Sequence, residues 1–423
     1  MGDLMILEED LKKMLENYEL TIYQMLRDDD VSVHLLKDAM RDETLKHYEV
    51  EDATMGYLYQ AKRNYVIRYV CETYRNMVER CKIRLANKHN LLETMAKLQS
   101  MELPEQRSKE WYEMRNNVLT ASSLADALGK GHFNTREGLL IDKTTTEQKP
   151  FVMHELMEWG VKYEPIATMF YEYLYTVKIL EFGLVPHKTF PIFGASPDGI
   201  CDIESPTEFV GRMLEIKCPP RRQFTADVPE HYWMQMQGQL ETCDLEECDF
   251  LQVKLLEYPG HETEIKDAYQ ADVLKENDII QEGLTAQGLP KGLVLSFKKM
   301  IDDQPHYTYE YAPLRLSYDQ LQSWKENILA TKLPENVTVI ESWYRIERYE
   351  CTLVLRDRDW WLETMPKIID FWEDVEKYRK EGNQSLLDKR DARKQKRKIS
   401  LTKNKPPTKS ATIIQINIAI TEK

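Results

Sequence analysis

The sequence predicts a mixed α/β core that is built on a central sheet and lies between two helical regions. Short stretches with strand character alternate with helical stretches between Pro104 and residue 315. This alternation is typical of α/β and α+β folds, in which helices cover a central sheet. With 42% hydrophobic residues among 423, the chain can form one large domain with appendages, or two domains.

The first 104 residues are predicted to be helical. Leu11, Met14 and Leu15 recur at helical spacing, and the same pattern continues from Tyr65 to Leu98. No Pro precedes Pro104, which favours long uninterrupted helices. We interpret this region as a support or docking layer; the alternative is a DNA-gripping role for its basic side chains, Lys62, Arg63, Arg68 and Arg75.

Residues 105–315 are predicted to form the core. Strands are expected at five stretches: Ile179–Phe182, Thr189–Ala195, Arg212–Lys217, Asp249–Leu256 and Gly292–Phe297. Helices are expected between them, at Ser122–Leu128, His154–Tyr175 and Glu230–Thr242.

Residues 316–381 are predicted to be a helical C-terminal extension, because apolar residues recur at three- and four-residue steps from Met365 to Tyr378. Residues 382–423 form a basic tail with Pro, Ser and Thr, which is expected to be disordered. Within this tail, Ala411–Ile420 alternates apolar and polar residues and could add an edge strand, including to a partner.

The charge distribution limits how this chain could contact nucleic acid. Lys389 to Lys409 holds ten Lys or Arg and one acid, a net charge of +9, so the rest of the chain carries −23 of the total of −14. An acidic body cannot hold DNA by its overall field, so contact would need a local basic groove or bridging metal ions. The tail resembles a nuclear localisation signal or a nucleic-acid arm, with a solubilising segment as the alternative.

The cysteines indicate an intracellular, reducing compartment. Their number is odd, and none forms a CxxC pair: Cys71, Cys81, Cys201, Cys218, Cys243, Cys248 and Cys351. No apolar run approaches the length of a membrane span, and the acidic N-terminus does not resemble a signal peptide. No phosphate-binding GxxxxGK[ST] loop is present, so no use of ATP is expected.

Two short segments contain the residues for metal-assisted chemistry. Gly194-Ala195-Ser196-Pro197-Asp198-Gly199 places Asp198 in a turn after a strand, where Pro and Gly fix the backbone. Met213-Leu214-Glu215-Ile216-Lys217-Cys218-Pro219 places Glu215 and Lys217 on one face of a strand. Mg²⁺, or Mn²⁺ in its place, prefers carboxylate and carbonyl oxygens, so Asp198, Glu215 and the Ile216 carbonyl are candidate ligands.

Each segment alone has a simpler explanation. An Asp in a Pro-Asp-Gly turn is usually a turn residue, and a Glu-x-Lys pair on a strand usually faces solvent. The two acids, however, lie 17 residues apart, the span of a hairpin, and Leu214 and Ile216 occupy the opposite face of the strand. Together, the segments favour a metal site with an ammonium beside it that can orient or acidify water.

Four blocks in this order resemble one family. Ser-Pro-Asp-Gly with Leu-Glu-Ile-Lys-Cys-Pro is similar to the lambda exonuclease and YqaJ viral recombinase proteins, within the PD-(D/E)XK nuclease superfamily. The other blocks are Trp111–Arg115 with Leu119–Ser123, Gly160–Pro165, and Tyr232–Gln237. The resemblance covers residues 107–256, and the longer chain is like members from large DNA viruses. It implies a restriction-endonuclease-like core with a central mixed sheet flanked by helices.

The resemblance also implies roles for individual residues. Asp198 and Glu215 would bind metal, Lys217 would act on the attacking water, Glu164 would support the site near a second metal, and Gln235 would help hold the water or the strand. Glu164 directly before Pro165 would otherwise be read as a residue at the start of a helix. Helical spacing places Gln235 and Gln239 on one face and Gln237 on another, so only one set can face inward.

A pocket for a 5′-terminal phosphate is implied by the same resemblance, with Arg115, Ser122 and Ser196 as its residues. A guanidinium fork suits a terminal phosphate. The alternative is that Arg115 pairs with a nearby acid, Glu110 or Glu113. This chain departs from the family's pattern near Lys188, the position that aligns with an upstream acid of lambda exonuclease.

The function implied is a Mg²⁺-dependent DNA exonuclease, acting 5′ to 3′ on linear double-stranded DNA to leave 3′ overhangs for recombination, repair or viral genome processing. The alternatives are an endonuclease or flap nuclease with the same site, and a non-catalytic DNA-binding recombination scaffold. Implied partners are double-stranded DNA, a single-strand annealing protein and further copies of the chain in a trimer, with no membrane. The compartment would be the host nucleus or cytoplasm if the protein is viral.

Overall fold

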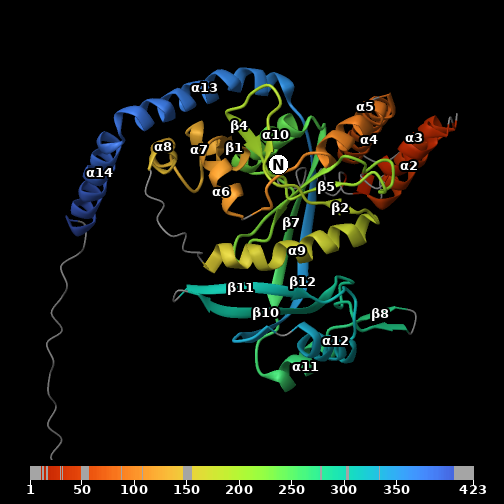
Figure 1. Ribbon diagram of the computed structural model, residues 1–423. Coiled ribbons are helices and arrows are strands. Elements are labelled where there is room, and N and C mark those ends of the chain that lie inside the picture. The colour runs from red at the N-terminus through yellow and green to blue at the C-terminus, as the bar shows by residue number, and fades with distance from the viewer. Residues whose placement is uncertain are drawn as a thin grey trace, which may run out of the picture.

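A computed structural model describes residues 11, 14–15, 18–28, 30, 32–48, 57–86, 88–106, 108–145, 155–276, 279–301, 304–332 and 334–403. Its centre is a mixed sheet flanked by helices, which confirms the predicted fold class (Figure 1). All seven cysteines are free thiols. Among the residues described, no helix combines the length and apolar character that crossing a membrane requires.

The main sheet has seven strands. Their spatial order is β11 (Gln304–Tyr311), β10 (Lys291–Ile301), β12 (Thr338–Leu355), β7 (Glu247–Glu257), β6 (Met213–Lys217), β5 (Gly199–Cys201) and β2 (Ile179–Leu180). Strands β6 and β7 run parallel, and the other neighbouring pairs are antiparallel. A smaller sheet contains β1 (Leu119–Thr120), β4 (Phe193–Ala195) and β3 (Val185–Pro186), and β8 (Leu274–Glu276) pairs with β9 (Ile279–Gln281).

Two long helices pack against β6 and β7 from different sides. Leu214 and Ile216 of β6 belong to the buried cluster of α9 (Glu155–Tyr175), whereas Met213 belongs to that of α10 (Glu230–Cys243). Since successive strand residues point to opposite faces, Glu215 and Lys217 share the face of Met213. Both candidate residues therefore face α10.

Strand β12 contradicts the predicted helical region. Residues 316–381 do contain α12 (Tyr318–Lys332) and α13 (Arg358–Glu381), but β12 lies between them as an 18-residue strand. β-branched and aromatic residues are frequent in this segment, and burial alternates at Glu350, Thr352 and Val354. Because β12 pairs with both β10 and β7, the expected boundary at 315 cuts through the central sheet.

The N-terminal region is helical, as predicted. It contains α2 (Tyr18–Arg27), α3 (Val33–His47), α4 (Tyr57–Ala86) and α5 (Lys88–Gln99), and the first three share a buried apolar cluster. Arg84 of α4 forms an ion pair with Glu247 of β7 and donates to the Val210 carbonyl at 2.9 Å. Arg212 contacts the same carboxylate at 3.1 Å. These contacts support the interpretation of a docking layer.

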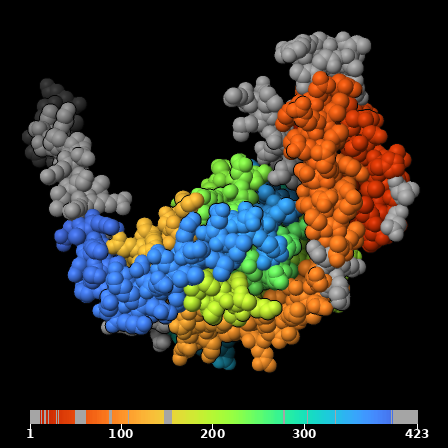
Figure 2. Space-filling model, turned by 90° about the horizontal axis from the view of Figure 1, so that it is seen from above, coloured from red at the N-terminus to blue at the C-terminus, as the bar shows by residue number. Residues whose placement is uncertain are grey.

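The part of the tail that the structure describes is helical, although disorder was expected. Helix α14 (Gln384–Lys403) follows α13, and its first turns are fixed because Leu386 is buried among residues of α8 (Arg136–Thr144) and α13. Figure 2 shows α14 and the N-terminal helices at opposite ends of the molecule, with α13 crossing between them. Residues 404–423, including the possible strand Ala411–Ile420, lie outside the described residues.

The remaining helices complete two smaller layers. Helix α6 (Lys109–Asn116) leads into β1, followed by the short 3-10 helix η1 (Ala121–Ser123) and α7 (Leu124–Ala127), which contact α10. Helix α11 (Glu262–Ala271) packs with α12 in a cluster that also contains residues of β10 and β12. The first layer is the one that brings Arg115 and Ser122 near the end of β4.

Candidate active site

Asp198 and Glu215 come from neighbouring strands. Asp198 directly precedes β5, and Glu215 is the third residue of β6, which pairs with β5. The backbone N–H of Ile216 donates to Asp198 Oδ2 at 2.7 Å, which fixes the turn carboxylate beside β6. The structure thus brings together the two predicted segments.

Glu215 is the most deeply enclosed of the candidate acids, with an exposed fraction of 0%. Its Oε1 accepts hydrogen bonds from Lys217 Nζ and, at 2.7 Å, from Gln235 Nε2. Its Oε2 accepts from Gln239 Nε2 at 2.8 Å. A buried carboxylate is costly unless it is paired and hydrogen-bonded, and here one ammonium and two amides do this.

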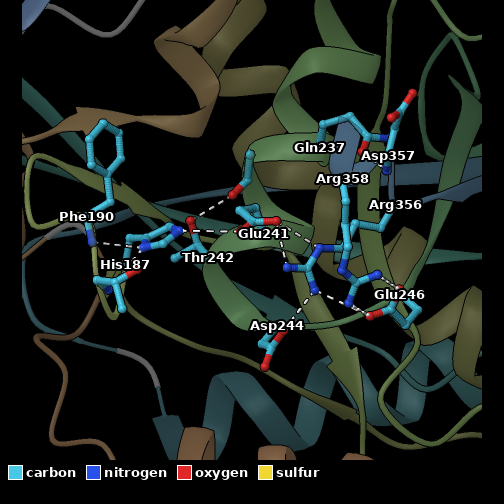
Figure 3. A network of polar contacts seen from close by, with 12 residues as sticks. His187, Phe190, Gln237, Glu241, Thr242, Asp244, Glu246, Arg356, Asp357 and Arg358 are labelled. Atoms are coloured by element: carbon cyan, nitrogen blue, oxygen red, sulfur yellow. Dashed lines mark hydrogen bonds and ion pairs between the residues drawn. The ribbon is translucent and has the colours of Figure 1, made fainter. Parts of the chain in front are cut away.

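The glutamines of α10 divide as helical spacing predicts. Gln235 and Gln239 both reach Glu215, whereas Gln237 donates to the Leu355 carbonyl at 2.8 Å and accepts from the Asp357 N–H at 2.6 Å. Figure 3 shows Gln237 next to Asp357. The sequence placed Gln239 on the same face as Gln235 by their four-residue spacing, but it assigned a role to Gln235 alone.

A polar network fixes the side of α10 that faces the end of β12. Arg356, only 6% exposed, binds Glu241 Oε2 at 2.6 Å and Asp244 Oδ1 at 2.8 Å (Figure 3). His187 lies on the other side of Glu241, with its Nε2 3.8 Å from the carboxylate. This network attaches β12 to α10, and so it holds the helix that carries the two glutamines.

Lys217 is held as an ammonium. Its Nζ contacts Glu215 and lies 5.0 Å from the centre of the Tyr232 ring, a residue that sequence reasoning did not single out. Burial acts to lower the pKa of Lys217, but the charges of Glu215 and Asp198 outweigh it and raise the pKa above its usual value. Lys217 therefore keeps its proton and acts as a hydrogen-bond donor and a fixed positive charge, with 24% of its side chain exposed.

Asp198 lies beside a cleft. The cleft has a volume of about 640 Å³ and is lined by Asp198, Glu164 and Pro165. Burial, followed by the charges of Glu215 and Glu164, raises the pKa of Asp198 well above its usual value, while Lys217 acts in the opposite direction. A carboxyl group whose pKa is raised by burial and by neighbouring carboxylates is typical of functional sites.

Glu164 lies in the middle of α9. Pro165 is inside the helix, so the reading of Glu164 as a residue at a helix start is wrong. Glu164 lines the same cleft as Asp198 and is close enough for its charge to act on that carboxylate. Across the described residues, no group of three or more His, Cys, Asp or Glu is placed to hold a metal ion, so the role of Glu164 near a second metal stays a prediction.

Arg115, Ser122 and Ser196 lie around Trp111. The Arg115 guanidinium stacks over the Trp111 ring at 4.4 Å and donates to Ser122 Oγ at 3.1 Å, and Trp111 Nε1 donates to Ser196 Oγ at 3.3 Å. Arg115 forms no ion pair with an acid in the described part of the chain, and Glu113 lies 3.7 Å from Lys109 instead. The structure therefore gathers the three residues expected to bind a phosphate.

Gln239 connects this cluster to the acids. Its Nε2 donates to Glu215 Oε2 at 2.8 Å and lies 3.4 Å from the Ser196 carbonyl. One amide thus contacts the backbone of a residue in the Arg115 cluster and the buried carboxylate. The two parts of the candidate site are held in a fixed relation.

Comparison with known proteins agrees with the sequence blocks. Residues 110–246 match the family model of the YqaJ-like viral recombinase domain. Over 311 residues the chain is 32% identical to the uncharacterized protein R354 of Acanthamoeba polyphaga mimivirus, a match that covers 67% of this chain and 54% of the relative. The chain thus spans about half the length of that viral relative.

Solved structures with a likeness to this chain include two exonucleases. The alkaline exonuclease LHK-Exo of Laribacter hongkongensis is 19% identical, with a TM-score of 0.37, and the match covers 66% of this chain and 99% of that one. The phage related exonuclease of Haemophilus somnus 129PT is 12% identical, with a TM-score of 0.31, and coverages of 64% and 99%. On the family match and the blocks it contains, residues 110–246 form a YqaJ-like viral recombinase domain.

Proposed function

We propose that this protein is a Mg²⁺-dependent DNA exonuclease that digests linear double-stranded DNA from 5′ ends and leaves 3′ overhangs. The observation that carries the proposal is the meeting of Asp198 and Glu215 across β5 and β6, with Lys217 bound to Glu215. The match of residues 110–246 to the YqaJ-like viral recombinase domain supports DNA as the substrate.

The residues present fit a hard divalent cation. Asp198 has its pKa raised by two neighbouring carboxylates, a repulsion that a cation would relieve. Asp198 and Glu215 would hold the ion together with the carbonyl of Ile216, which lies on the side of Asp198 because the N–H and C=O of a strand residue point the same way. Glu164 could contribute from the cleft. When bound, the cation supplies charge stabilisation at the scissile phosphate.

The chain's own groups position the remaining partners of hydrolysis. Lys217 can orient the attacking water and, through its fixed positive charge, make that water more acidic, because the ammonium is kept charged beside Glu215. Gln235 and Gln239 hold the Glu215 carboxylate in one orientation. Side chains fixed in this way lower the entropy cost of bringing water and phosphate together.

The Arg115 cluster favours an exonuclease over an endonuclease or flap nuclease with the same site. An arginine that forms no ion pair with an acid among the residues described and is stacked on Trp111 suits a terminal phosphate dianion, which occurs only at DNA ends. The non-catalytic scaffold is disfavoured because Asp198, Glu215 and Lys217 are all present and in contact through Glu215 or β6.

The biological setting follows from the family and remains part of the proposal. Digestion to a 3′ overhang would serve recombination, repair or viral genome processing, with a single-strand annealing protein as a partner. Assembly as a trimer around the duplex, and an intracellular compartment such as the host nucleus or cytoplasm, are the expectations that accompany it.

A time course on linear duplex DNA labelled at one end tests the proposal. With Mg²⁺, the wild-type chain should digest 5′-phosphorylated duplex from the 5′ end, and chelation of the metal should stop it. Asp198→Ala and Lys217→Ala should abolish digestion while DNA binding stays measurable. If either variant digests at the wild-type rate, the role given to that residue is wrong, and internal cuts in circular DNA would favour the endonuclease.

A further inference from the structure

The C-terminal end of α6, directly next to Arg115, is held by two cations from other helices. Lys143 Nζ, at the end of α8, donates to the carbonyls of Arg115 and, at 2.8 Å, of Val118. Arg379 Nη2, near the end of α13, donates to the Asn116 carbonyl at 2.6 Å. The last carbonyls of a helix have no partner within the helix, and cations there stabilise both the carbonyls and the helix dipole.

The two cations also support each other. Arg379 Nε donates to the backbone carbonyl of Lys143 at 3.1 Å, and its guanidinium stacks over Trp372 at 5.4 Å. Arg379 therefore joins the ends of α6, α8 and α13. The backbone next to Arg115 is thus fixed by Arg379, which lies 263 positions beyond Asn116 in the sequence.

Arg115, Lys143 and Arg379 form a cluster of positive charge. Within the described ranges, none of the three forms an ion pair with an acid. Burial, followed by the charges of Arg115 and Arg379, lowers the pKa of Lys143 to about 7, whereas Asp142 acts in the opposite direction. Three cations that repel one another at one place are stabilised when an anion binds.

We infer that Arg379 and Lys143 are positioning residues for terminal-phosphate recognition, because together they hold the end of α6 so that Arg115 faces a 5′-phosphate of the DNA. Helix α13 lies outside the matched domain at residues 110–246. The C-terminal extension thereby becomes part of the end-recognition site. This inference rests on the proposed function, since it assigns a role within the same phosphate pocket.

The structure offers a matched control on the same two helices. Arg136 of α8 binds Asp370 at 2.9 Å and Asp374 at 2.8 Å, both on α13, and stacks over Phe371 at 5.4 Å. Arg136→Ala would loosen α13 from α8 without removing a contact to α6. A general effect of loosening α13 can therefore be separated from the loss of the cap on α6.

The test measures, by fluorescence anisotropy, the affinity of the chain for labelled duplex DNA that carries either a 5′-phosphate or a 5′-hydroxyl. A chelator is present so that the DNA is bound but not digested. Wild-type should prefer the phosphorylated duplex. Arg379→Ala and Lys143→Met should lose most of this preference, Arg379→Lys should retain part of it, and Arg136→Ala should keep the wild-type ratio. Thermal melts followed by circular dichroism confirm that each variant is folded.

Combination with Arg115→Ala shows whether the effect passes through Arg115. Arg115→Ala alone should abolish the preference, and adding Arg379→Ala should not change the ratio further. A wild-type ratio in Arg379→Ala, or an equal loss in Arg136→Ala, overturns the inference. If wild-type itself shows no preference, it is the phosphate pocket of the proposed function that fails. Absence of digestion with an intact preference would contradict only the nuclease.

Discussion

Replacement of Gln239 by Leu removes a hydrogen bond to a fully buried carboxylate. The Nε2 of Gln239 donates to Glu215 Oε2 at 2.8 Å, and Gln239 and Glu215 are 1% and 0% exposed. A hydrogen bond to a charged group contributes ~1.5–3 kcal/mol, so Gln239→Leu should lose about that free energy of unfolding. The same loss of transition-state stabilisation would slow digestion ~10- to 150-fold, at about 1.4 kcal/mol per factor of ten.

Gln237→Leu is the control for this experiment. Gln237 lies on the same helix with the same 1% exposure, and its hydrogen bonds go to Leu355 and Asp357. Urea unfolding should show both variants destabilised. Initial digestion rates on labelled duplex, measured where both variants are folded, should fall only for Gln239→Leu. Equal rates in the two variants would refute the idea that Gln239 acts by orienting Glu215.

Three further predictions concern pH and the C-terminus. Burial acts to raise the pKa of Glu247, but the charges of Arg212 and Arg84 outweigh burial and hold this pKa below its usual value. The contribution of Glu247 to the free energy of unfolding is therefore complete above pH ~4.3 and is lost as the pH falls through the lowered pKa. Glu247→Gln should cost ~3–5 kcal/mol in urea unfolding and flatten the acid side of the stability profile; an unchanged profile would contradict this. The pKa of Lys143 is about 7, so Lys143 loses its charge as the pH rises through that value. The preference of the wild type for 5′-phosphorylated duplex should therefore decline over this range, whereas Lys143→Met should show no matching decline. Truncation after Asp388, which keeps the buried Leu386, should weaken DNA affinity or nuclear uptake but not the chemical step; equal affinity and equal distribution would remove both roles for the basic segment.

The candidate site could be predicted from the sequence because residues that are close in the sequence determine the positions of its side chains. Asp198 is fixed by a Pro-Asp-Gly turn, and Glu215 and Lys217 share a face through the two-residue period of a strand. The four-residue step from Gln235 to Gln239 was equally local and placed both on one face, but Gln239 was given no role because, of the two, only Gln235 belongs to the resembling block. Arg379 had no such signal, since its contact with Asn116 depends on how α13 packs.

The fold was harder to predict where pairing with distant strands determines the secondary structure of a segment. The segment that forms β12 carries Glu and Arg among its aromatic residues, so its strand period was hidden, and its conformation depends on β10 and β7 on either side. The tail shows the converse case. Its composition indicates disorder, but Leu386 and Leu387 pack against the body and allow α14 to begin.

Titration of the chain with Mn²⁺, followed by electron paramagnetic resonance, tests the central claim without DNA or turnover. The account predicts that wild-type binds the ion, that Mg²⁺ displaces it, and that Asp198→Ala loses the binding, while Gln237→Leu retains it. Undiminished Mn²⁺ binding in Asp198→Ala, or no binding by the wild-type chain, would contradict a metal site shared by Asp198 and Glu215.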